Sequence, residues 1–420
     1  MTKTFQKKYL ALWCLANLFF AFQFILRLSA GILREDIIQK FSVDAASFGT
    51  LAGYYYLGYS GAQIPLGIML DRLSFKLVTS IAIATAGIGT LTFVTTDNWN
   101  LLLLGRFLIG VGSGVAFLSV AKITTTYFEE KYHSLLLGFS FTFGLIGAVF
   151  GATPMQLLFD HFGYNNTFNA LALIAFLLAG AMLIMGKIDT TPKSNASAPF
   201  SSVIKLLLSP KILLIGVAGG LMVGPLEGFA DVWAIPFFSQ IFAMSKNESR
   251  TITSFIYIGM CFGGPFLALI ANFLRSTNFM IFLTGTFTII VFLILFYLPP
   301  LSLTNSAILM FFLGICCCYQ VLVFTVVSSQ VEPSSAGLAI AVTNCINMSF
   351  GHLFHSVIGN ALQNNWNGAV NESGSAIYTA DNFIYALAII PICCFVGQLG
   401  FAFLSLRSKA DTSKYSNFTG

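Results

Sequence analysis

The sequence predicts an all-α polytopic membrane protein, with 12 transmembrane helices arranged in two six-helix halves. Hydrophobic residues make up 56% of its 420 positions and charged residues 9%, against about 25% charged in an ordinary soluble protein. Apolar stretches of about 18 to 25 residues recur along the chain, and each is long enough to cross a hydrocarbon layer of about 30 Å as a helix. A membrane barrel would instead alternate apolar and polar residues over about ten positions, a pattern that does not occur here.

Polar breaks between the apolar stretches define the expected spans. These are residues 9–31, 48–70, 77–96, 101–122, 135–159, 167–186, 211–240, 251–274, 279–299, 306–329, 335–361 and 383–406. The one long polar connection is rich in Ser, Pro and Lys, which is typical of a linker. We therefore expect an N-terminal half at 1–186, a cytoplasmic linker at 187–210 and a C-terminal half at 211–420.

Lys and Arg residues set the expected orientation. With the N-terminus inside, the inner connections and termini hold fourteen of them and the outer loops four. Cytoplasmic connections of membrane proteins carry the excess of positive charge, so both termini and the linker are predicted to be cytoplasmic. The same placement accounts for the net charge of +5 without a nucleic-acid partner.

The eight cysteines lie in apolar stretches and lack the paired spacing of a zinc site. No metal and no cofactor is expected. The chain also shows no nucleotide-binding P-loop and no paired nucleophile and base, so it is predicted not to be an enzyme.

The connection between the second and third expected spans reads GIMLDRLSFK and contains Gly67, Asp71, Arg72 and Lys76. This spacing resembles the signature loop of the major facilitator superfamily, although Ser74 stands where that family has Gly. The resemblance implies a transporter whose two halves rock about a central site, with this loop as the inner gate.

A second motif, RFLIGVGSG, contains Arg106, Gly110, Gly112 and Gly114 and matches a pattern of the same family in span four. Glycines at this spacing are typical of closely packed membrane helices. Span five has Pro154 without a preceding Gly, which disfavours a drug and proton antiporter. More weakly, the chain resembles the branch that holds amino-acid transporters of intracellular bacteria and lysosomal-type dipeptide carriers.

A few charged or titratable residues lie within the expected spans, where an ionised side chain costs about 2.5 to 3.5 kcal/mol. They are Arg27, Arg106, Glu227, Asp231, His352 and His355; Lys122 can reach the inner headgroups from its span end. At about 1.5 Å per residue, Arg27, Glu227, His352 and Arg106 all fall at a similar outer level. Arginines of one half thus face carboxylates of the other.

Three interpretations of the carboxylates stay open. Glu227 and Asp231 form ion pairs with Arg27 and Arg106 that close the outer side; or Glu227 carries a proton; or a substrate ammonium binds here. Asp231, with Arg106, is the better outer-gate residue. Arg27 is suited to bind a carboxylate, or else pairs only with span seven.

Other polar side chains complete the candidate site for substrate binding or proton coupling. They are Tyr55, Tyr59, Trp233, Asn347 and His352. Each has a structural alternative, as an interfacial aromatic residue or as a hydrogen-bonding residue between helices. Pro225 and Pro236 bracket the carboxylates, so span seven is expected to bend there.

These observations predict a secondary active transporter that moves a small polar solute, an amino acid or short peptide, by alternating access, with proton symport as a candidate for its coupling. The expected context is a monomer in the lipid bilayer of a bacterial inner membrane. The alternatives are an organic-anion or siderophore exporter of the same superfamily and a transporter-fold receptor without flux. A capture of carboxylates by the arginines would favour the exporter.

Overall fold

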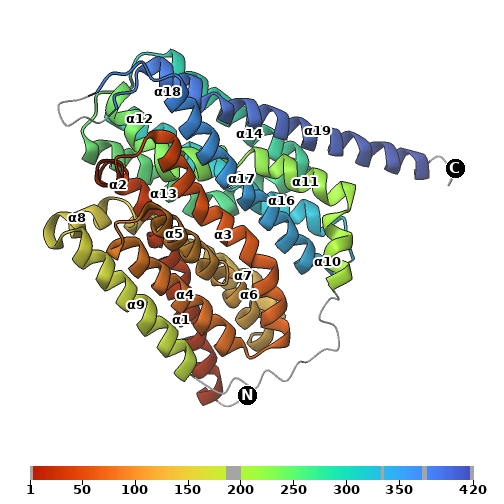
Figure 1. Cartoon of the computed structure of the whole chain (residues 1–420). Coiled ribbons are helices and arrows are strands. Elements are labelled where there is room, and N and C mark those ends of the chain that lie inside the picture. Colours follow the sequence, from red (N-terminus) through yellow and green to blue (C-terminus); the bar gives the residue numbers. More distant parts are fainter. Residues whose placement is uncertain (1–2, 186–199, 333–334, 371–375, 417–420) are drawn as a thin grey trace.

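The computed structural model describes residues 3–185, 200–332, 335–370 and 376–416, and it is built of helices (Figure 1). The first half contains α1 (Lys3–Ile32), α2 (Arg34–Phe41), α3 (Ala45–Arg72), α4 (Phe75–Thr95), α5 (Trp99–Ser113), α6 (Ala116–Tyr127), the short η1 (Glu130–Tyr132), α7 (His133–Phe150), α8 (Thr153–Phe162) and α9 (Tyr164–Ile184). The second half contains α10 (Phe200–Leu207), α11 (Pro210–Leu221), η2 (Gly224–Trp233), α12 (Ala234–Ile241), α13 (Lys246–Phe273), α14 (Thr277–Tyr297), α15 (Leu303–Cys317), α16 (Tyr319–Ser328), α17 (Ala336–Asn364), α18 (Ala380–Leu387) and α19 (Ile389–Ser416).

Within the described residues, ten helical segments are long and apolar enough to cross a membrane. The pair α7 and α8, bent by 42°, makes an eleventh if it counts as one span. α3 is not one of these ten segments, because its many Gly and Tyr residues make it less apolar. Its 28 residues nevertheless give it a length of about 42 Å at 1.5 Å per residue. The structure confirms an all-α membrane fold, whereas the total of twelve spans and the cytoplasmic termini stay predictions.

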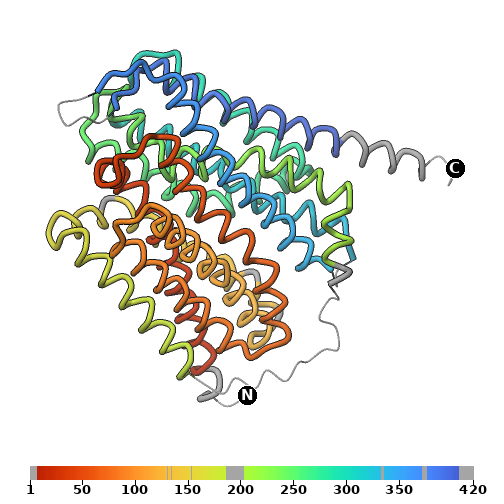
Figure 2. The backbone as a smooth tube through the Cα atoms, in the orientation of Figure 1, coloured from red at the N-terminus to blue at the C-terminus, as the bar shows by residue number. Residues whose placement is uncertain are grey.

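The two halves lie side by side, α1 to α9 in red to yellow and α10 to α19 in green to blue (Figures 1 and 2). They meet where α1 contacts η2, α3 contacts α17 and α7 contacts α13. One end of the bundle carries the short helices α2, α12 and α18, and α10 lies at the opposite end. We call the first of these the outer end, following the predicted orientation.

Several expected spans are interrupted. Span seven is divided into α11, η2 and α12, as the prolines and glycines around its carboxylates suggested. Span four is divided between α5 and α6 next to Gly114. The expected linker lies outside the described residues over 187–199, but residues 200–207 form α10, which was not predicted.

The glycines of α5 allow close helix packing. A Cβ atom built on Gly110 would lie 2.0 Å from the carbonyl oxygen of Tyr55, and one on Gly112 would lie 2.4 Å from the carbonyl oxygen of Ala82. No larger side chain fits at either distance. α5 therefore rests directly against the backbones of α3 and α4, which fixes the helices that carry the site.

Candidate functional site: a charge network between the two halves

The carboxylates lie on η2, a ten-residue π-helix whose residues are all buried. Pro225, at its start, has no backbone N–H to donate, and Gly224 and Gly228 add no side chain that would hold an α-helical course. π-helical segments are rare in proteins, and those that occur are often found at functional sites. Its geometry turns Glu227 and Asp231 toward the same guanidinium group on the other half.

Arg27 of α1 binds both carboxylates. Its Nε donates to Oδ2 of Asp231 at 2.7 Å, and its Nη2 donates to Oε2 of Glu227. The side chains are almost fully buried, with residue exposures of 7% for Arg27, 1% for Glu227 and 5% for Asp231. The ion pair expected between Arg27 and Glu227 is therefore present, and Arg27 also holds Asp231.

Two tyrosine hydroxyls complete the coordination of Asp231. Tyr257 of α13 donates to Oδ1 at 2.8 Å, and Tyr56 of α3 donates to Oδ2. The guanidinium of Arg27 also lies over the ring of Tyr56, 5.1 Å from its centroid. Neither tyrosine is among the site residues expected from the sequence, because their contact with Asp231 joins three separate helical segments, α3, η2 and α13.

Arg106 does not pair with Asp231, contrary to one of the expectations. Its Nη1 and Nη2 donate to the carbonyl oxygens of Leu26 and Arg27, at 2.8 and 2.5 Å. Its guanidinium lies 4.9 Å from the centroid of the Tyr55 ring. The physical reason is geometric, since Arg106 belongs to the same half as α1 and meets its backbone before it can reach η2. Arg106 therefore positions Arg27.

The other candidate tyrosines pack beneath this network. Tyr55 donates to Oε1 of Gln23 at 2.6 Å, and its ring stacks on that of Tyr59 with centroids 6.0 Å apart. Both are buried, at 1% and 8% exposure. Tyr55 and Tyr59 lie where α1, α3 and α5 meet, within the first half.

Trp233 lies at the end of η2 nearest the outer end and is fully buried. The guanidinium of Arg34, on α2 of the other half, lies 5.4 Å from the centroid of its ring. Trp233 thus joins the two halves above the network, and its indole Nε1 is buried without a partner among the described residues.

The candidates on α17 have different surroundings. His352 packs against Gly53 of α3, and its ring meets that of Tyr54 edge to face. Asn347 is fully buried, and both polar atoms of its side chain lack a partner within the described part of the chain. It lies next to Gly219, on the side of η2 away from the outer end.

The family model of the Major Facilitator Superfamily matches residues 12–354 of this sequence. The chain belongs to the Major Facilitator Superfamily. It is therefore a multi-pass integral membrane protein of a family of transport proteins, as the resemblance of its two motifs implied.

Solved structures of the superfamily share its fold. A bacterial homologue of the human lysosomal transporter Spinster, inward-facing and occupied, superposes with a TM-score of 0.73 at 17% identity, over 97% of this chain and 98% of that one. The nucleoside transporter NupG superposes with a TM-score of 0.70 at 15% identity, over 94% and 98%. At these identities the likeness concerns the fold alone.

Among curated relatives, the 4-hydroxybenzoate transporter PcaK of Pseudomonas aeruginosa is 27% identical over 153 residues, 36% of this chain and 34% of that protein. The nitrate/nitrite transporter NrtP of Picosynechococcus is 29% identical over 121 residues, 29% of this chain and 22% of that protein. The chain thus matches about a third of the length of these relatives, or less.

The loop that resembles the superfamily's signature lies between α3 and α4. Asp71 pairs with Nζ of Lys122 on α6 at 2.6 Å, so Lys122 does not simply extend to the headgroups as expected. Ser74 has φ −62° and ψ 116°, a conformation open to any residue, which is why the missing Gly is tolerated. Gly67 has open space beside it, Arg72 is exposed and Lys76 is half-buried.

Proposed function

We propose that this member of the superfamily is a secondary active transporter that carries a small polar zwitterion, an amino acid or short peptide, inward together with a proton. The observation that carries the proposal is the buried contact of Arg27 with Glu227 and Asp231 across the two halves. Alternating access requires this contact to break whenever the outer end opens. The proposed setting is a monomer in a bacterial inner membrane.

Opening the outer end would leave complementary charges facing the same space. Arg27 stays with α1, and both carboxylates stay with η2. A guanidinium group binds a carboxylate through two parallel hydrogen bonds, in bidentate geometry, and a carboxylate binds an ammonium group. A solute with both groups satisfies both sides of the open seam, which favours a zwitterion over a simple anion or cation.

The charge count supports proton coupling. One guanidinium faces two carboxylates. Closing the contact between the two halves while both carboxylates are ionised therefore buries one excess negative charge. Asp231 accepts from Arg27, Tyr56 and Tyr257, which stabilise its ionised form. The Glu227 carboxylate accepts from Arg27, with Tyr56 and Gln320 as further hydrogen-bonding neighbours, but among the described residues it lacks the contact with Tyr257 that Asp231 has. Glu227 is therefore the carboxylate that takes the proton.

Asn347 supports a polar solute below the network. Its amide lies beside Gly219, where Tyr319 of α16 also donates to the Gly219 carbonyl oxygen at 2.7 Å. Leaving a buried amide unpartnered costs about 1 to 3 kcal/mol. A bound solute that hydrogen-bonds Asn347 would remove this cost.

Flux into proteoliposomes tests the proposal. We expect a panel of radiolabelled amino acids and dipeptides to include a solute that accumulates when an inward proton gradient is imposed. Glu227→Gln should lose accumulation and keep exchange of the same solute, because its neutral side chain closes the seam without a proton. Accumulation by Glu227→Gln under the same gradient would exclude Glu227 as the proton carrier.

The relatives named as 4-hydroxybenzoate and nitrate/nitrite transporters support a second candidate substrate class, a small organic or inorganic anion. The same panel therefore includes 4-hydroxybenzoate and nitrate. Transport of these anions without transport of any zwitterion would replace the first proposal by the second.

A further inference from the structure

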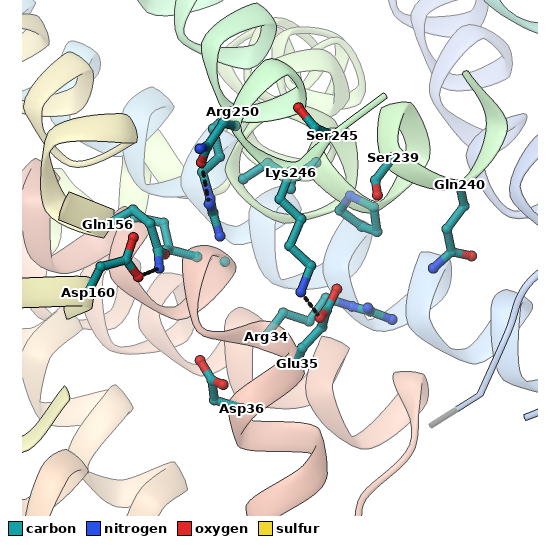
Figure 3. A pocket seen from close by; sticks show the side chains of 15 residues that line it. Arg34, Glu35, Asp36, Gln156, Asp160, Ser239, Gln240, Ser245, Lys246 and Arg250 are labelled. Carbon is teal, nitrogen blue, oxygen red and sulfur yellow. Dashed lines mark hydrogen bonds and ion pairs between the residues drawn. The ribbon is translucent and has the colours of Figure 1, made fainter. Parts of the chain in front are cut away.

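A separate cavity, lined mainly by polar and charged side chains, lies at the outer end (Figure 3). It has a volume of about 400 Å³ and is lined by both halves: by α2 and α8 on one side and by α12 and α13 on the other. We call this cavity the outer vestibule. Because its walls belong to different halves, it exists in this form only while the outer ends are together.

One ion pair crosses the vestibule. Nζ of Lys246 on α13 lies 2.5 Å from Oε2 of Glu35 on α2 (Figure 3). Both side chains are more than half exposed, and an exposed pair contributes about 0 to 1 kcal/mol. This pair alone does not hold the outer ends together.

The other charged groups that line the vestibule come from both halves, and they form no ion pair with one another within the described residues. Asp160 accepts from Nε2 of Gln156 at 2.6 Å, and Arg250 donates through Nη1 to Oδ1 of Asn247 at 3.1 Å. Asp36 has neither an ion pair nor a side-chain hydrogen bond within the described residues. Two guanidinium groups, of Arg34 and Arg250, and the carboxylates of Asp36 and Asp160 thus line one cavity without an ion pair among them in the described part of the chain. The Arg34 guanidinium lies over the ring of Trp233, which leaves Arg250 as the guanidinium free to bind a ligand.

Arg250 is 8% exposed, and its Nε is buried without a partner among the residues that the structure describes. Leaving a buried donor unsatisfied costs about 1 to 3 kcal/mol, and more for a charged group. Asp36 is the matching acceptor on the other half. Partial burial raises the pKa of the Asp36 carboxyl, and the nearby Lys246 opposes this. A ligand with a negative group for Arg250 and a positive group for Asp36 would stabilise both side chains.

We infer that the outer vestibule binds a small zwitterion, with its carboxylate on Arg250 and its ammonium group on Asp36, and that the bound molecule holds the outer ends of the two halves together. The inference rests on the proposed function for the class of solute. The position of the site rests on the vestibule alone.

Binding here has a defined consequence for transport. A ligand that contacts both halves binds the closed outer end and not the open one, so it shifts the equilibrium toward closure. The same solute at high external concentration then slows its own uptake. Binding in the vestibule therefore inhibits transport at high solute concentration, an effect that binding at the central site does not produce.

Two measurements on the full-length protein test this. Equilibrium dialysis in lipid nanodiscs at neutral pH uses radiolabelled L-alanine and glycylglycine, with L-lactate as the probe that lacks the ammonium group. Proteoliposome uptake of the same zwitterions is measured from low to high external concentration. The vestibule variants are Asp36→Asn and Arg250→Gln. Lys40→Gln and Asp97→Asn are matched controls, since they break an ion pair of 2.9 Å at the same end that does not line the vestibule.

We expect both vestibule variants to weaken zwitterion binding at least tenfold and to abolish the fall in uptake at high concentration, without slowing uptake at low concentration. The controls should behave as the unmodified protein, and L-lactate should bind more weakly than L-alanine. Binding that Asp36→Asn and Arg250→Gln leave unchanged would overturn the inference, and so would binding of no zwitterion at all. Loss of binding in these variants without flux of any zwitterion would support the vestibule and refute the proposed function.

Discussion

We expect closure of the outer end to depend more on Asp231 than on any other residue of the charge network. Its carboxylate accepts hydrogen bonds from Arg27, Tyr56 and Tyr257, and these donors come from α1, α3 and α13. Asp231→Asn keeps one oxygen acceptor and replaces the other oxygen by an amide that donates toward existing donors. The substitution therefore removes the ion pair and at least one hydrogen bond while preserving the size of the side chain.

The magnitude follows from burial. Removing one partner of a buried ion pair costs about 3 to 5 kcal/mol, and the remaining oxygen and Glu227 place this case near the lower figure. Since about 1.4 kcal/mol changes an equilibrium tenfold, a loss of about 3 kcal/mol shifts the closed and open populations of the outer end about a hundredfold toward opening. In Glu227→Gln the Asp231 contacts persist and the excess negative charge is removed, so no comparable shift toward opening is expected.

Hydrogen exchange measured by mass spectrometry reports this opening in peptides from α2 and η2. Asp231→Asn should speed exchange in both peptides, whereas Glu227→Gln should leave exchange near that of the unmodified protein, because its neutral side chain still allows the two halves to close. Asp97→Asn serves as the control, because its side chain is 87% exposed and its pair with Lys40 is a surface contact. Unchanged exchange in Asp231→Asn, or a larger effect in Glu227→Gln, would refute the central role given to Asp231.

Three further outcomes are expected. Arg27→Lys should reduce uptake at least tenfold, because a single ammonium group cannot serve two carboxylates as Nε and Nη2 do; uptake equal to that of the unmodified protein would contradict this. Gly110→Ala should lower the thermal unfolding midpoint, since its Cβ would lie 2.0 Å from the Tyr55 carbonyl oxygen, whereas Gly61→Ala, with open space, should not. Zwitterion binding in the vestibule should weaken as the pH falls through the raised pKa of Asp36, below which its carboxyl is neutral, and this should begin at a higher pH than for an ordinary aspartate near about 3.9. Dialysis across this pH range checks the last point, and a pH dependence that persists in Asp36→Asn would assign it to another group.

The candidate site shows where prediction from sequence ends. The depth of Arg27 and Glu227 along their helices followed from residue counting, because a helix rises by a fixed amount per residue. Their direct contact agrees with that estimate. The partner of Arg106 did not follow, because depth fixes the level of a side chain in the membrane and not its direction around the helix axis. Arg106 was free to face η2 or α1, and the packing of α5 against α3 and α4 turned it to α1.

The sequence by itself determined the membrane class, the helical fold and the family. The physical reason is that a bilayer leaves no water to satisfy backbone groups, so long apolar stretches have to be helices, and the charged loop motif is local in sequence. The tertiary structure alone decided which groups meet: the three donors around Asp231, the pairing of Asp71 with Lys122, and the outer vestibule. Each of these joins helices that are distant in the chain, and their relative rotation depends on side-chain packing that no single stretch of sequence contains.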